Sequence, residues 1–406
     1  MRRLSLDTDR RFSSPDNEHL VTNLPGQPHV DFRHYAGYVT VNEKNGRALF
    51  YWFYEATTHP DGKPLVLWLN GGPRCSSVGY GATQEIGPFL VANDGHGIKY
   101  NPYSWNREAN MLFLESPVGV GFSYSNTTSD YDILGDDFTA NDAYAFLHNW
   151  LLKFPSYRTR AFYIAGESYA GKYVPELAEL IHDRNADPFL HIDLRGILMG
   201  NPETSDAEDW TGMVDYAWSH AVISDETHKI IRNSCNFNSN DTWSNDDCNQ
   251  AVDELFRQKI FFQMPRIMGG YDPCLDEYAR AFYNRPDVQK ALHISDGHQL
   301  KNWNICNRKI FNEWSDSKPS VLPIYKKQIA AGLRIWVYSG DTDGRVPVLS
   351  TRYSLGSLVS GWFQEYKGLM FATFRGAGHA VPIFKPSESL AFFSAFLQGE
   401  SPPSSR

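Results

Sequence analysis

One junction in the sequence indicates the fold most clearly: Ala161-Phe162-Tyr163-Ile164-Ala165, followed directly by Gly166-Glu167-Ser168-Tyr169-Ala170-Gly171. Its first five residues form a short apolar run that predicts a buried strand, and residues 169–182 place apolar side chains on one side of a predicted helix. A serine between small residues at such a junction is typical of a strained turn that exposes a nucleophilic oxygen. A serine that only caps the helix is the alternative interpretation of the same pattern.

Similar apolar runs recur on both sides of this stretch, at residues 65–69, 111–114, 197–199, 335–338 and 369–374. Runs that are apolar on both faces predict central strands of a parallel sheet that is covered by helices. Helical patterns such as residues 138–152 alternate with them, and Asn45-Gly46 between two β-prone runs predicts a hairpin at the start of the sheet. The pattern predicts an α/β protein of the α/β-hydrolase fold, with a central, mostly parallel sheet flanked by helices.

This prediction divides the chain into three segments. Residues 20–200 form the first part of the α/β-hydrolase core, and residues 331–400 form its second part. Strand runs are absent from residues 201–330, where polar, Trp-containing and Cys-containing sequence predicts a helical insertion or cap.

Composition excludes several classes of protein. Hydrophobic residues make up 42% of the 406 residues, which excludes a mainly disordered chain. The formal net charge of -9 provides no basic field for nucleic acid, so we expect no nucleic-acid partner. No apolar run approaches the ~18 residues that span a bilayer, and the start of the chain turns polar early, so we expect neither a membrane anchor nor a signal peptide in this sequence.

A nucleophilic serine needs a base, and the base needs an orienting acid, on later loops of the chain. The predicted strand at residues 335–338 is followed by Asp341 and Asp343, and the predicted strand at residues 369–374 is followed by His379. Each candidate follows a strand end, where open α/β sheets assemble their sites. The sequence therefore predicts that Ser168, His379 and one of the two aspartates act together.

The turn Asn70-Gly71-Gly72-Pro73 follows the predicted strand at residues 65–69. Its glycines allow backbone amides to approach a reacting carbonyl oxygen, with the amide of Tyr169 as the second donor of an oxyanion hole. An ordinary tight turn is the alternative interpretation.

The five cysteines show neither a CxxC pair nor a histidine at zinc-ligand spacing, so we predict disulfides and no metal site. Because five is odd, at least one cysteine lacks an intramolecular partner. The sequons that begin at Asn126 and Asn240 predict N-glycosylation and indicate the secretory pathway.

Three motifs in this order resemble the serine carboxypeptidase family: Asn70-Gly71-Gly72-Pro73-Arg74-Cys75-Ser76-Ser77, Gly166-Glu167-Ser168-Tyr169-Ala170-Gly171 and Gly376-Ala377-Gly378-His379-Ala380-Val381-Pro382. The similarity covers roughly residues 20 to 400. Residues 115–124 are most similar to the plant serine carboxypeptidase-like members.

The resemblance implies a serine carboxypeptidase that removes C-terminal residues from peptides and proteins through an acyl-enzyme, without a cofactor. It implies Ser168 as nucleophile, His379 as general base and Asp343, rather than Asp341, as orienting acid. It implies Gly72 and Tyr169 as the oxyanion-hole donors, and a site for the terminal carboxylate of the substrate made of Asn70, Gly71, Glu85 and Glu167. Two glutamates that face a carboxylate must share protons, which favours activity in acid and a vacuolar or secreted enzyme. A homodimer is compatible with the resemblance.

The resemblance also implies disulfides between Cys75 and Cys306 and between Cys235 and Cys248. Cys274 then lacks a partner, because the chain runs from Gln258 into Lys259 where relatives carry a longer, cysteine-containing stretch. A second segment is expected to be missing after Gly356.

Arg74 departs from the family pattern, which has Gly at this position. If the loop requires a positive φ there, a side chain is costly, and a long cation alters the pocket. Arg74 and the two apparent deletions therefore make a catalytically impaired member one alternative to a peptidase. The resemblance to plant members implies a second alternative, an acyltransferase that uses the same triad on glucose esters. Glu167 favours the peptidase, because the acyltransferase-like members tend to have Asp at that position.

Overall fold

The computed structural model describes residues 18–187, 191–239, 241–262, 272–295, 300–356, 363–366 and 368–402. Asn240 lies outside the described residues, as does the stretch after Gly356 where a deletion is expected. Among the described residues, none of the helices is both long and apolar enough to cross a membrane.

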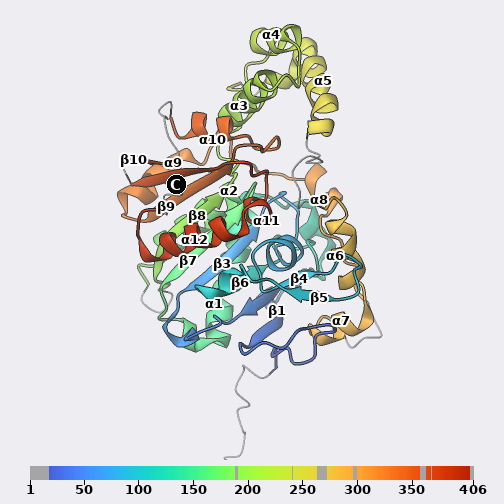
Figure 1. Cartoon of the computed structure of the whole chain (residues 1–406), viewed down its shortest axis with the longest axis vertical. Helices are drawn as coiled ribbons and strands as arrows, with labels where there is room; N and C mark the ends of the chain where they lie inside the picture. The colour runs from blue at the N-terminus through green and yellow to red at the C-terminus, as the bar shows by residue number, and fades with distance from the viewer. Residues whose placement is uncertain are drawn as a thin grey trace, which may run out of the picture.

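A nine-stranded sheet in the order β1-β2-β6-β3-β7-β8-β9-β11-β10 forms the centre of the fold (Figure 1). The strands from β6 to β11 in this order run parallel, whereas β1, β2 and β10 pair with their neighbours in antiparallel fashion. The strands are β1 (His34–Asn42), β2 (Arg47–Tyr54), β3 (Leu65–Asn70), β6 (Asn110–Leu114), β7 (Phe162–Glu167), β8 (Leu194–Gly200), β9 (Arg334–Gly340), β10 (Phe363–Tyr366) and β11 (Leu369–Phe374).

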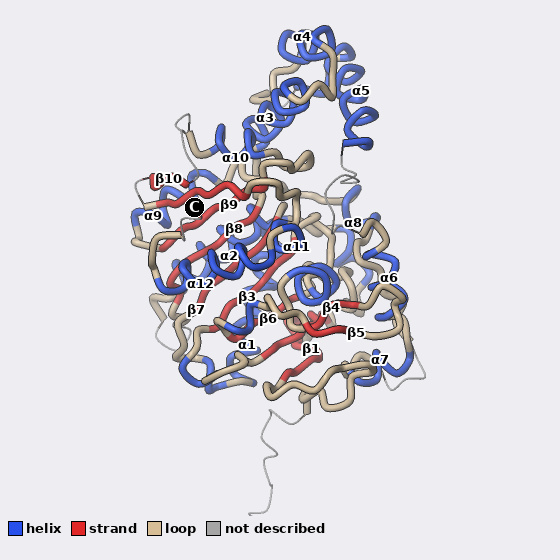
Figure 2. The backbone as a smooth tube through the Cα atoms, in the orientation of Figure 1, coloured by secondary structure: helices blue, strands red, loops and turns tan. Residues whose placement is uncertain are grey.

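Both faces of this sheet are buried because successive side chains of each strand enter different apolar clusters. Val66 and Trp68 of β3 belong to one cluster with Phe393 of α12 (Pro386–Gln398). Leu65, Leu67 and Leu69 pack with α1 (Asp136–Lys153) and α2 (Ala170–Arg184) in the other. Figure 2 shows the strands as one layer with helices on its two sides. The α/β-hydrolase layering predicted from the continuous apolar runs is therefore the observed one.

All of the predicted strands are present, and three short ones were missed. The small sheet of β4 (Phe89–Val91) and β5 (Ile98–Tyr100) and the edge strand β10 carry too few residues for an apolar period to stand out. Between β8 and β9 the described residues contain helices but no strand, as the sequence indicates. The boundaries of the three predicted segments stay a prediction.

The helices between β8 and β9 form two groups. One group, α3 (Asp206–Ser219), α4 (Asp225–Ser234) and α5 (Asp246–Phe262), shares an apolar cluster of its own and projects away from the sheet (Figure 1). The other helices are α6 (Leu275–Tyr283), α7 (Pro286–Ala291), α8 (Arg308–Asn312) and α9 (Leu322–Ala330); beyond β9 lie α10 (Val348–Ser354) and α11 (Val381–Phe384). Of these, α6 packs against β4.

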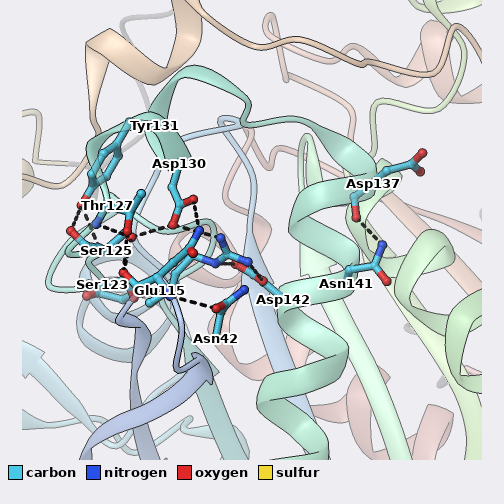
Figure 3. A network of polar contacts seen from close by, with 12 residues as sticks. Asn42, Glu115, Ser123, Ser125, Thr127, Asp130, Tyr131, Asp137, Asn141 and Asp142 are labelled. Atoms are coloured by element: carbon cyan, nitrogen blue, oxygen red, sulfur yellow. Dashed lines mark hydrogen bonds and ion pairs between the residues drawn. The ribbon is translucent and has the colours of Figure 1, made fainter.

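A buried charge network anchors the hairpin to α1. Arg47 of β2 forms ion pairs with Asp130 at 3.0 Å and with Asp142 of α1 at 2.7 Å. Ser125 Oγ donates to Asp130 at 2.6 Å, so the loop that carries the exposed Asn126 is fixed against the same charges (Figure 3). Because removing one partner would leave a buried charge without compensation, this network holds the loop firmly in place.

Two disulfides connect the cysteines that the resemblance pairs. Cys75 bonds Cys306, and Cys235 bonds Cys248 between α4 and α5. Cys274 is exposed and is the free cysteine.

We expect one equivalent of iodoacetamide to react with the unreduced, folded protein, at Cys274. An exposed thiol is accessible to alkylation, whereas the other four cysteines form two disulfides. Peptide mapping by mass spectrometry locates the label, and Cys274→Ser is the matched control that should take up none. Alkylation of Cys75 or Cys235 in the unreduced protein would contradict this pairing.

Candidate active site

The turn between β7 and α2 holds Ser168 in a conformation that few residues other than glycine adopt. Ser168 has φ 88°, in the left-handed region. A Cβ at Gly166 would come within 2.6 Å of Leu69 O and 2.7 Å of Ala170 Cβ, so only glycine fits there. Neighbouring backbone fixes the turn, because Ser168 N donates to Gly200 O at 3.1 Å. Ser168 is thus placed as a nucleophile elbow requires, with Ala170 tolerated as a small residue.

His379 and Asp343 form a hydrogen-bonded pair. The Nδ1 atom of His379 lies 2.8 Å from Asp343 Oδ2. The same carboxylate accepts hydrogen bonds from Asn201 Nδ2 at 2.6 Å and from the amides of Arg345 at 2.7 Å and Val346 at 3.2 Å. Asp343 is therefore held rigidly and orients the imidazole ring through its Nδ1–H.

The other candidate acid has a different role. Asp341 accepts a hydrogen bond from Gly376 N at 2.6 Å and so ties the β9 loop to the loop that precedes His379. Asn201, which follows the end of β8 at the same edge of the sheet, was not among the predicted site residues. The Gly200-Asn201-Pro202 sequence after a predicted strand was the signal that could have found it.

Ser168, Asp343 and His379 line one cavity of about 350 Å³. Although they share this cavity, Ser168 and His379 form no side-chain hydrogen bond with each other among the described contacts. Such bonds are often long before substrate binds and tighten in the reacting complex. The predicted site residues Asn70, Gly71, Gly72, Glu85 and Glu167 line the same cavity.

The Gly71-Gly72 turn lies directly against the elbow. A Cβ at Gly71 would come within 2.3 Å of Tyr169 N, and Gly72 has φ 130°. Glycine is therefore required at both positions, for close approach at the first and for backbone conformation at the second. Tyr173 OH donates to Pro73 O at 2.8 Å and fixes the turn from α2. The arrangement brings the backbone of the turn and the Tyr169 amide together beside Ser168.

A buried carboxyl that the sequence analysis did not single out supports this loop from behind. Glu115 Oε1 accepts hydrogen bonds from Ser76 Oγ at 2.5 Å and from Trp303 Nε1 at 3.1 Å. It thereby ties the segment after Cys75 to the segment before Cys306 and reinforces the link made by the disulfide.

Glu85 and Glu167 form a buried carboxyl pair at the end of the cavity. Each is 4% exposed, and Asn70 Nδ2 donates to Glu85 Oε1 at 3.1 Å. The second oxygen of each carboxyl, Oε2, has no hydrogen-bond partner among the described residues. Burial raises the pKa of both, and the charge of Glu85 raises the pKa of Glu167 further. The pair therefore favours protonated forms, which can donate hydrogen bonds to an anionic ligand.

We expect the free energy of unfolding to fall as the pH rises from 5 to 8, and to fall less in Glu85→Gln. Because the folded pKa of this carboxyl is raised, its stabilising contribution is complete below the unfolded value of about 4.3 and is lost as the pH rises through the folded value. The difference between the two proteins should be on the order of 1 to 3 kcal/mol. Urea denaturation at both pH values measures it, with the exposed Glu400→Gln as the control. An equal fall in the free energy of unfolding between pH 5 and pH 8 in the wild type and in Glu85→Gln would contradict the expectation.

The structure corrects the expectation about Arg74. A positive φ occurs at Gly72, whereas Arg74 is absent from the non-glycine residues with positive φ among the described residues. The Arg74 backbone therefore carries no left-handed strain. The expected backbone cost therefore does not apply, whereas Arg74 does line the cavity, so an effect of this cation on the pocket stays a prediction.

Comparison with known proteins identifies the family. A serine carboxypeptidase family model matches residues 25–399. The chain belongs to the serine carboxypeptidase family. It is 64% identical to serine carboxypeptidase-like 31 of Arabidopsis thaliana, covering 98% of this chain and 93% of that one. It is 47% identical to serine carboxypeptidase-like 26 of rice, covering 95% of this chain and 91% of that one.

A solved structure supports the fold of this family member. The prohormone-processing carboxypeptidase of Saccharomyces cerevisiae matches with a TM-score of 0.78 and 22% identity, over 94% of this chain and 96% of that chain. The match with the first Arabidopsis relative runs over 457 positions, more than the 406 residues of this chain. Relatives thus carry residues that this chain lacks, and the places of the missing segments stay a prediction.

Proposed function

We propose that this serine carboxypeptidase family member hydrolyses the C-terminal residues of peptides and proteins with Ser168 as its nucleophile. The observation that carries this proposal is a hydrogen-bonded His379–Asp343 pair that shares one cavity with Ser168 and the buried carboxyl pair. Ser168 with the His379–Asp343 pair suits acyl transfer, and the buried pair of Glu85 and Glu167 suits recognition of a free carboxylate.

In the proposed mechanism, Ser168 Oγ attacks the scissile carbonyl carbon while His379 takes the hydroxyl proton. The backbone amides of Gly72 and Tyr169 stabilise the oxyanion. The C–N bond breaks as His379 returns the proton to the leaving amine, and an acyl-enzyme remains. Water then attacks this ester with His379 as base, which releases the shortened peptide and restores the serine. Every step uses side chains and backbone groups of this chain.

In the proposed reaction, the buried carboxyl pair makes the enzyme specific for the C-terminal end of a peptide. A substrate carboxylate accepts hydrogen bonds from Asn70 and from the protonated forms of Glu85 and Glu167, whereas an internal peptide bond offers no such anion. Because ionisation of the pair would repel the substrate, activity should be highest in acid. The same acid requirement and the two disulfides support a secreted or vacuolar location.

Two assays test the proposal. Release of the last residue from an N-blocked dipeptide at pH 5, together with loss of release from the C-terminally amidated form, is the expected result. Transfer of an acyl group from a glucose ester to an alcohol, without peptide hydrolysis, would instead establish the acyltransferase alternative. A purified protein that reacts with neither substrate nor a fluorophosphonate would establish the impaired alternative.

A further inference from the structure

Two arginines on the cavity wall have no role in the proposed mechanism. Arg74 lies two residues beyond Gly72 in the loop after β3, and Arg345 lies two residues beyond Asp343 in the loop after β9. Both line the cavity that contains Ser168 and His379. Loops from the carboxyl ends of parallel strands meet at one edge of a sheet, which explains why residues so distant in sequence share this wall.

Backbone contacts hold both arginines in place. Arg345 N donates to Asp343 Oδ1 at 2.7 Å, and Arg74 O accepts from Asn307 N at 3.0 Å. The Nη1 atom of Arg74 lies 3.4 Å from Arg308 O. Burial, and then the charges of Arg345 and Arg308, lower the pKa of Arg74, so each of these two cations is near enough to repel Arg74. An anion bound between Arg74 and Arg345 would relieve that repulsion.

The acidic groups that line the cavity are engaged elsewhere. Asp343 is paired with His379, and burial favours the neutral forms of Glu85 and Glu167. The fourth, Asp276 of α6, accepts hydrogen bonds from Tyr80 OH at 3.1 Å and Gln84 Nε2 at 3.5 Å, and burial raises its pKa. The cavity wall therefore sets two guanidinium groups against carboxyls that are hydrogen-bonded within the wall or favoured in their neutral forms.

We propose that Arg74 and Arg345 form a cationic subsite that selects peptides with an acidic side chain on one of the two residues flanking the scissile bond. This inference rests on the proposed peptidase function and names the substrate class of that site. Arginine suits the task because its guanidinium is always charged and matches the planar geometry of a carboxylate.

The test compares N-blocked dipeptides that differ only by Glu against Gln, placed either before or after the scissile bond. At pH 5.5 and low salt we expect kcat/KM to be about tenfold higher for Glu in one of the two positions, mainly through KM. Arg74→Gln and Arg345→Gln should each reduce this preference to about threefold, and the double variant should remove it. The readout is the ratio of kcat/KM for Glu and Gln peptides within each variant, which a general loss of activity would leave unchanged. The matched control is Arg195→Gln at the opposite end of β8, which should keep the full preference.

A binding measurement separates this inference from the proposed function. Calorimetric titration of Ser168→Ala with the same peptides needs no turnover. Tighter binding of the Glu peptide that depends on the two arginines would support the subsite, even if the wild type hydrolysed neither peptide. Equal affinity for Glu and Gln in both positions would overturn it, even if both were hydrolysed. If Arg74→Gln failed to fold, the exposed Arg345→Gln alone would decide the result.

Discussion

Replacing Ser168 with Ala should lower kcat for a blocked dipeptide by a factor of about 10⁴ to 10⁶ and should abolish fluorophosphonate labelling. The hydroxyl at this position is the nucleophile of the proposed reaction, and the cavity would retain only its binding groups and backbone donors without it. The loss should appear in kcat rather than in KM, because no contact with the peptide's terminal carboxylate is removed.

The substitution should leave the fold unchanged. Ser168 is buried at a backbone with φ 88°, a conformation that alanine must also adopt, so the strain is present in both proteins. Equal circular dichroism spectra and thermal midpoints of the two proteins provide the control. Labelling that persists in Ser168→Ala, located by mass spectrometry at another serine, would show that the nucleophile has been assigned wrongly.

The sequence predicted the sheet well because its central strands are buried on both faces. The residues Leu65 to Leu69 of β3 are all buried and all apolar, and such a run is visible without any knowledge of the fold. β5 ends in the exposed residues Lys99 and Tyr100 and is only three residues long. Its pairing with β4 depends on tertiary contacts that no local pattern reveals.

The candidate site was predictable where the chemistry requires a particular residue at a strand end. Gly166 and Gly71 are fixed by close backbone approach, and both lie within recognisable motifs. The position of Asn201 after a predicted strand marks it as a candidate, but its partner could not be derived, because its amide reaches a carboxylate that lies 142 residues later in the chain. Likewise, spacing alone could not show that Arg74 has an unstrained backbone, since φ depends on how the whole loop folds.

The second large effect that we expect follows from replacing the aspartate that orients His379. Asp343→Asn should reduce kcat/KM by about 10⁴, whereas Asp341→Asn should reduce it by less than about tenfold. An Asn at position 343 can present its amide nitrogen to His379 Nδ1, and this contact favours the tautomer that cannot accept the serine proton. The acceptor that Asp343 offers to Asn201 would also be weakened, because a neutral amide oxygen replaces a carboxylate.

Asp341→Asn is the matched control, since it makes the same chemical change two residues away. Asp341 accepts from Gly376 N rather than from the imidazole, and an amide oxygen can still accept that bond. Steady-state kinetics near pH 5 on both variants, with equal folding verified by circular dichroism, give the comparison. The pH profile adds a second criterion, because loss of the orienting carboxylate should shift the acidic limb of kcat/KM, which a merely structural defect would leave in place. If Asp341→Asn were the more damaging change, Asp341 rather than Asp343 would be the acid that orients His379 during the reaction.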